Sequence, residues 1–80
     1  MFIADKLKQC REEINLSQSD FMFELDKLGL RLSRQTLINW ESGDTVPDVN
    51  DLSIIARFFK KELEYFFDKK QYHSGKERKE

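Results

Sequence analysis

Residues 33–40 contain a cluster of side chains of the kinds that recognise nucleic-acid bases. Its polar members are Arg34, Gln35, Thr36 and Asn39. Arginine can donate two hydrogen bonds to guanine, and glutamine or asparagine can form two with adenine. Leu37 and Trp40 lie among them at the three-residue spacing of the buried side of a helix. The pattern favours a short helix that presents these polar groups outward, although composition alone fits an ordinary solvated helix face equally well.

Capping and stop signals give this helix its limits. Ser33 is a residue type preferred at helix N-caps, and Gly43 suits the left-handed residue that ends a helix. An earlier helix is predicted from Ser17 to Leu28, where Gly29 stops it. Two short helices joined by a glycine-containing connection are the sequence pattern of a helix-turn-helix, whose second helix enters the major groove of DNA.

Three further helices complete the expected fold. The first has apolar residues at a spacing of 4, 3 and 4, namely Ile3, Leu7, Cys10 and Ile14. Asp48 is placed to cap a fourth helix, and a short fifth helix is predicted over residues 62–67. The sequence therefore predicts an all-α bundle of about five short helices. We expect one domain over residues 1–68 and a basic, flexible tail over residues 69–80.

Length and composition exclude several classes of function. The chain has 80 residues, one cysteine and one histidine, His73, so an internal disulfide framework and a structural Cys/His zinc site are excluded. No Ser–His–Asp grouping or glycine-rich phosphate loop is present. We therefore expect no catalytic residues, no metal, no cofactor and no small-molecule ligand. Apolar runs are too short for a membrane span and no signal peptide is evident, so a cytoplasmic location is expected.

The net charge of −1 initially argues against nucleic acid as a partner. The charges are unevenly distributed, however. Residues 42–56 have three aspartates and no basic residue, whereas residues 69–80 have five basic and two acidic side chains. Acidity is thus concentrated outside the predicted DNA-contacting helix, and we expect weak non-specific binding with selectivity from base contacts.

An ordered series of residues resembles the Cro and phage-repressor family of helix-turn-helix regulators, also called the xenobiotic-response-element (XRE) type. The matching residues are Leu7, Arg11 to Glu13, Leu16 to Gln18, Ser33 to Leu37, Trp40 to Gly43, Pro47, Leu52, Ile55, Ala56, Phe59, Leu63, Tyr65 and Phe66. The resemblance covers roughly residues 3–67. It implies a lambda-repressor-like fold and a transcriptional repressor, of bacterial, phage or mobile-element origin, that binds a double-stranded DNA operator as a homodimer.

The resemblance also implies a role for each matching side chain. The base contacts would be Arg34, Gln35 and Asn39. Backbone or flanking contacts would come from Gln18, Ser33, Thr36 and Ser42, with Arg31 and Lys27 as further candidates. Arg11 and Glu41 would form an internal ion pair that ties the first helix to the third.

One stretch departs from the family pattern. Ser17 and Trp40 are 23 positions apart, about five more than is usual in the family. The surplus falls between residues 21 and 32, where it is expected to lengthen the second helix and the connection that follows it. Ile38, an apolar residue at a normally polar position, would then pack on that lengthened helix or touch a thymine methyl group.

The chain has more aromatic residues than a small core needs, with seven Phe, two Tyr and one Trp. Surplus apolar surface often marks an interface, and Tyr65, Phe66 and Phe67 are the candidates for a homodimer contact. The same surplus favours an alternative function, a protein-interaction module of this fold such as an antitoxin or anti-repressor subunit. Cys10 is interpreted as a small core residue rather than a redox sensor.

Overall fold

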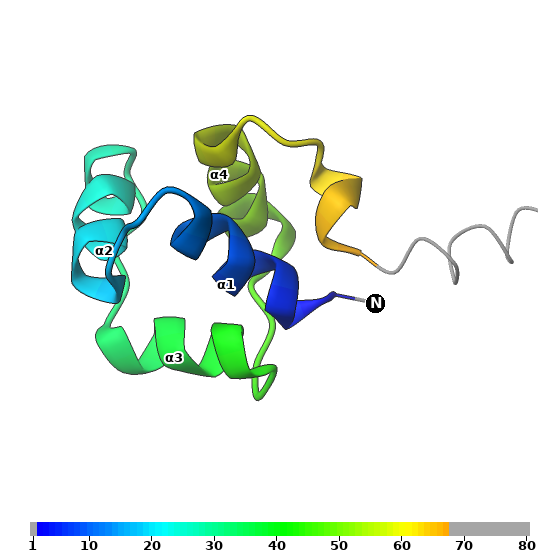
Figure 1. The fold of residues 1–80 in the computed structure, drawn as a ribbon, viewed down its shortest axis with the longest axis horizontal. Helices are drawn as coiled ribbons and strands as arrows, with labels where there is room; N and C mark the ends of the chain where they lie inside the picture. Colours follow the sequence, from blue (N-terminus) through cyan, green and yellow to red (C-terminus); the bar gives the residue numbers. More distant parts are fainter. Residues whose placement is uncertain (1, 68–80) are drawn as a thin grey trace, which may run out of the picture.

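Four α-helices and one 3-10 helix follow one another in the computed structural model, which describes residues 2–67 (Figure 1). The elements are α1 (Ala4–Glu13), α2 (Gln18–Lys27), α3 (Arg34–Ser42), α4 (Val49–Phe59) and the 3-10 helix η1 (Leu63–Phe66). Within the described range the one β-type pairing is an isolated antiparallel bridge between Phe2 and Phe67. The prediction of an all-α fold is confirmed, whereas the predicted tail, residues 69–80, lies outside the described residues.

Side-chain caps start three of the helices where the sequence predicts. An oxygen of Ser17, Ser33 or Asp48 accepts a hydrogen bond from the backbone N–H three residues on, at 3.0, 3.1 and 2.8 Å respectively. Each bond satisfies a backbone donor that the first turn of a helix leaves without a partner. At the other end of α3, Gly43 takes a left-handed conformation with φ of 88°. The limits of the helix-turn-helix are therefore set by local chemistry.

The predicted fifth helix is shorter than expected. It is a 3-10 helix of four residues rather than a helix over residues 62–67. Before it, Lys60 adopts a left-handed conformation with φ of 58°, and the N–H of Lys61 bonds to the carbonyl of Ala56 at 2.9 Å. This arrangement ends α4 without a glycine. The remaining segment is too short to support a stable α-helix, whose first turn is costly to form.

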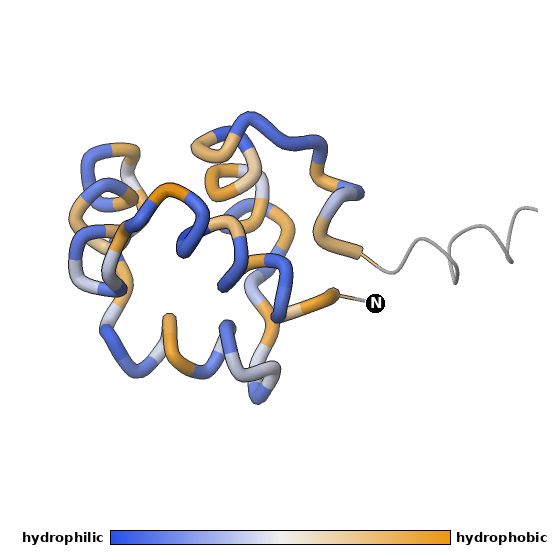
Figure 2. Tube along the Cα trace, viewed as in Figure 1, coloured by the Kyte–Doolittle hydropathy of each residue, from blue (hydrophilic) through white to orange (hydrophobic). Residues whose placement is uncertain are grey.

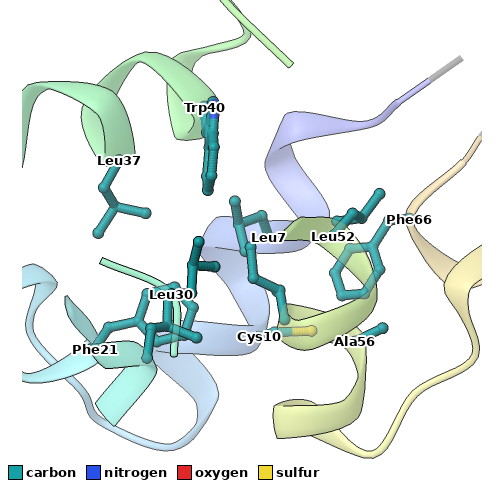
Figure 3. Packing of buried hydrophobic residues seen from close by; sticks show 11 residues of the cluster. Leu7, Cys10, Phe21, Leu30, Leu37, Trp40, Leu52, Ala56 and Phe66 are labelled. Atoms are coloured by element: carbon teal, nitrogen blue, oxygen red, sulfur yellow. The ribbon is translucent and has the colours of Figure 1, made fainter. Parts of the chain in front are cut away.

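The core receives side chains from every helix (Figure 3). Its buried members are Leu7, Cys10, Phe21, Leu25, Leu30, Leu37, Trp40, Leu52, Ile55, Ala56 and Phe66. Figure 3 shows Leu37 and Trp40 extending from α3 toward this cluster, with the ring of Phe66 beside Leu52. Hydrophobic and hydrophilic residues alternate along each helix (Figure 2), as burial of one side requires.

Ile14, predicted for the apolar stripe of the first helix, and Leu28, the predicted last residue of the second helix, are both exposed. Ile14 and Leu28 are 51% and 50% exposed. Both are C-cap residues, one position beyond the end of α1 and of α2, so the helical spacing no longer places them over the core. After Gly29, with φ of 93°, the chain turns back and buries Leu30. The connection after α2 is thus anchored to the core by Leu30 and by the partly buried Leu32.

No helix in residues 2–67 is long and apolar enough to cross a membrane.

Candidate nucleic-acid interface

Helix α3 has one buried side and one solvent-facing side. Leu37, Trp40 and Glu41 are buried, and α3 packs against both α1 and α2. Arg34 and Gln35 are exposed, and Asn39 is partly exposed. In Figure 1 α3 lies at the lower edge of the fold, with α1 and α2 on one side of it. The three residues predicted to contact bases are therefore all at least partly exposed, with Arg34 at the end of α3 that adjoins α2.

A buried ion pair fixes α3 to α1. Arg11 Nε donates to Glu41 Oε2 at 2.7 Å, and Arg11 Nη2 donates to Glu41 Oε1 at 3.1 Å. A third bond runs from Arg11 Nη1 to the carbonyl of Leu16 at 2.7 Å. Only 8% of Arg11 and 7% of Glu41 is exposed. The hydrogen bond to Glu41 raises the pKa of Arg11 despite its burial, so the guanidinium stays charged and donates two hydrogen bonds to the carboxylate of Glu41.

Gln18, predicted to contact the DNA backbone, is joined to the same ion pair. Its Nε2 donates to Glu41 Oε1 at 3.1 Å. Since an amide nitrogen has two N–H groups, one donor is left for an acceptor outside the protein. Gln18 is also the first residue of α2, where backbone N–H groups favour an anion such as a phosphate.

A hollow of about 180 Å³ lies between the middle of α1, the start of α2 and the second half of α3. It is lined by Lys8 of α1, Gln18 of α2, and Ile38, Glu41 and Ser42 of α3. Lys8 is exposed and adds a positive charge beside the free donor of Gln18. The sequence prediction missed Lys8. Its position one turn before Arg11, on the same side of α1, is the signal that could have identified it.

Ile38 is 36% exposed and lies in this hollow. None of the other residues that line the hollow belongs to the lengthened stretch, residues 21–32. An apolar side chain is therefore placed on the solvent-facing side of α3, between the base-contact candidates and Ser42.

The base-contact candidates are held by neighbouring side chains. Arg34 Nη2 donates to the hydroxyl of Ser19 on α2. Gln35 Nε2 donates to Asn39 Oδ1 at 3.0 Å, one turn further along α3. These contacts orient the groups before any ligand is present, which reduces the entropy lost when they bind.

The hydroxyl groups predicted to flank the bases make local bonds. Ser33 Oγ lies 2.9 Å from Thr36 Oγ1 and also caps α3. Ser42 Oγ donates to the carbonyl of Asn39 at 3.1 Å. Ser33 and Ser42 are exposed at opposite ends of α3, and Thr36 is partly exposed.

Arg31 and Lys27 lie apart from α3, and each pairs with a nearby carboxylate. Arg31 Nε is 3.1 Å from an oxygen of Asp26, and Lys27 Nζ is 3.2 Å from an oxygen of Glu24. Exposed pairs of this kind contribute little to stability and exchange readily for other anions. Arg31 and Ser19 line the same surface hollow, and Ser19 accepts the hydrogen bond from Arg34. Arg31 therefore lies near the N-terminal end of α3.

The prediction for the dimer contact is wrong for Phe66. This side chain is 0% exposed, because η1 turns it into the core against α4 and α1. Tyr65 and Phe67 are partly buried, and Phe67 forms the bridge with Phe2. The large apolar side chains that are most exposed lie elsewhere, at Phe23, Val46 and Val49. Of these, Val49 has the spacing of the core residues of α4, whereas Val46 lies in the loop between α3 and α4.

Cys10 is 3% exposed, and burial raises the pKa of its thiol. It belongs to the core cluster. Among residues 2–67 no group of three or more His, Cys, Asp and Glu side chains lies close enough to hold a metal ion.

The chain matches a known protein family. A family model described as helix-turn-helix matches residues 7–66, from the middle of α1 to the end of η1. No curated protein matches the chain at a significant level.

Proposed function

Because the chain belongs to the Cro and XRE-type helix-turn-helix family of DNA-binding domains, we propose that it is a sequence-specific regulator of transcription that binds double-stranded DNA. The family is one of DNA-binding regulators and not of enzymes. The observation that carries the proposal is the two-sided construction of α3. One side of α3 is fixed to the rest of the domain by buried Leu37 and Trp40 and by the ion pair of Glu41 with Arg11. The exposed residues of α3 include the side chains that could recognise bases.

In the proposed complex the N-terminal half of α3 enters the major groove. Arg34, Gln35 and Asn39 contact base edges. Contacts to the phosphate backbone or its flanks come from Lys8, Gln18, Ser33, Thr36 and Ser42, and from Arg31 and Lys27 at the other end. The hollow that joins Lys8 to the start of α2 supports a phosphate position there, because it combines an ammonium group with helix N-terminal donors.

We propose further that the protein acts as a homodimer and represses transcription by occupying its operator. Two copies of α3 would contact half-sites about 34 Å apart, one turn of the DNA helix. Tyr65 and Phe67 remain candidates for the interface, and Phe23, Val46 and Val49 offer larger exposed apolar surface.

Selection of bound sites from a pool of random duplexes at ~100 mM salt tests the DNA-binding proposal. One enriched operator is expected, and Arg34→Ala should relax selection at one base pair at a cost of ~1–3 kcal/mol. Arg57→Ala, an exposed arginine of α4, serves as the matched control and should leave selection unchanged. Absence of any enriched site would refute a sequence-specific regulator.

A second function is favoured by one observation. Val46 and Val49 are 58% and 63% exposed within a stretch, residues 42–56, that has three aspartates and no basic residue. Such a surface suits a basic protein partner better than DNA, as in an antitoxin or anti-repressor subunit. Size-exclusion chromatography with light scattering, with and without DNA, separates the two functions. A monomer that ignores DNA would support the interaction module.

A further inference from the structure

Three residues of α3 form a triangle on its solvent-facing side. Gln35, Ile38 and Asn39 occupy positions i, i+3 and i+4, whose Cβ atoms lie about 5–6 Å apart on a helix. Successive base pairs of DNA are about 3.4 Å apart, so such a triangle spans one or two base pairs. Its three side chains therefore act on the same small part of an operator.

The bond between Gln35 and Asn39 fixes which groups this triangle offers. Gln35 Nε2 donates to Asn39 Oδ1 at 3.0 Å, which occupies the oxygen of Asn39 and one N–H of Gln35. The groups that remain are the oxygen of Gln35, its second N–H and the two N–H groups of Asn39. The pair thus presents one acceptor beside several donors.

This arrangement suits one base better than the others. In the major groove adenine presents an N6–H donor and the N7 acceptor, which match the Gln35 oxygen and the neighbouring N–H groups. Guanine presents two acceptors and no donor, so the N–H groups could bind it but the Gln35 oxygen would be left without a partner. The coupled amides therefore favour adenine over guanine.

Ile38 adds an apolar group next to the amides. Thymine, the partner of adenine, carries a methyl group that projects into the major groove. Ile38 is 36% exposed at a position where the surrounding side of α3 is polar, and the core does not require it. Covering a methyl group would remove apolar surface of both groups from water.

We infer that Gln35, Asn39 and Ile38 together recognise an A·T base pair or an adjacent A·T step, with the coupled amides on adenine and Ile38 on the thymine methyl group. This inference rests on the proposed function. The inference adds to the proposed function the identity of the bases in this part of the operator.

The test uses the full chain and the operator obtained by site selection. Thymines in the selected half-site are replaced one at a time by uracil, which lacks the methyl group, and adenines by 7-deazaadenine, which lacks N7. We expect uracil at one position to lower affinity about fourfold, as for loss of one buried methyl group. We expect 7-deazaadenine at one position to lower affinity about fivefold, as for one lost hydrogen bond.

Variants then connect each effect to its side chain. Ile38→Ala should bind uracil and thymine operators equally well, and Asn39→Ala should weaken selection of adenine over guanine while the selection due to Arg34 persists. Ile14→Ala, at an exposed isoleucine just after α1, is the matched control and should keep the full uracil effect. Circular dichroism of each variant checks that it is folded.

The outcomes distinguish the inference from the function on which it rests. A selected operator whose uracil effect disappears in Ile38→Ala supports the inference. A selected operator with no A·T preference, or a uracil effect that persists in Ile38→Ala, overturns the inference while sequence-specific binding stands. Failure to select any operator overturns the proposed function itself.

Discussion

Replacing Arg11 by methionine removes one member of the buried ion pair and keeps much of its apolar bulk. Three hydrogen bonds are lost, two to the Glu41 carboxylate and one to the carbonyl of Leu16. The carboxylate then keeps only the bond from Gln18, at 3.1 Å, in a position where 7% of the residue is exposed. A buried charge that has lost its partner is costly because water cannot solvate it.

The expected loss is about 3–5 kcal/mol, the usual cost of removing one member of a buried pair. For 80 residues, total stability is on the order of 4–12 kcal/mol at ~0.05–0.15 kcal/mol per residue. Arg11→Met should therefore remove about a quarter or more of the free energy of unfolding. The double variant Arg11→Met/Glu41→Leu removes both charges and should lose much less than the sum of the single variants.

Urea unfolding followed by Trp40 fluorescence and far-ultraviolet circular dichroism measures both losses. Trp40 is the single tryptophan of the chain and is 5% exposed, so its emission reports directly on α3 leaving the core. Arg57→Met, at an exposed arginine of α4, is the control and should change stability by less than about 0.5 kcal/mol.

Two results would refute the structural role of the pair. One is an Arg11→Met variant as stable as the parent, above all if it had lost DNA affinity. The other is a double variant whose loss equals the sum of the single losses, because a coupled pair requires a coupling energy.

Three further expectations follow from local geometry. Gly43→Ala should lower the free energy of unfolding by about 1–2 kcal/mol, because φ of 88° is unfavourable for a residue with a Cβ atom. The added Cβ would lie 3.7 Å from the Cβ of Ala4, which is an ordinary contact. A loss of stability well above ~1–2 kcal/mol would therefore contradict backbone strain as its cause. Cys10 should react with iodoacetamide at pH 8 at least ~10-fold more slowly than the urea-unfolded chain, since its raised thiol pKa and burial suppress the thiolate. As the pH rises, the thiol of the unfolded chain ionises before that of the folded chain, so the free energy of unfolding should fall as the pH rises through the raised pKa of Cys10. Equal iodoacetamide reactivity of the folded and unfolded chains would contradict the burial of Cys10. Lys8→Ala should weaken DNA binding uniformly across sequences and reduce the salt slope by about 1, measured by fluorescence anisotropy at several salt concentrations. A change in the selected sequence would instead assign Lys8 to base recognition.

Local signals made most of the fold predictable. Ser17, Ser33 and Asp48 begin their helices, and Gly43 ends one, because capping depends on the side chain and on bonds within one turn. The division of α3 into a buried side and a polar side follows from the same kind of information, the spacing of Leu37 and Trp40.

Features that depend on tertiary context were not predictable from one sequence. Ile14 and Leu28 continue an apolar pattern but lie just past their helices, and Lys60 ends α4 in a conformation that favours glycine. Phe66 and its neighbour Phe67 have the same side chain, and only the packing of η1 decides which one is buried. Lys8 could be assigned to the candidate interface only after α1, α2 and α3 had been placed beside one another.

In α3 the residues that stabilise the fold are different from the residues proposed to contact DNA. Arg34, Gln35, Ile38 and Asn39 are absent from the buried cluster, whereas Leu37 and Trp40 belong to it and Glu41 lies in the ion pair. On the proposed function, mutations at the first four positions change the preferred operator without a large loss of stability. A library randomised at these four codons should consist largely of folded proteins that differ in the DNA sequence they select.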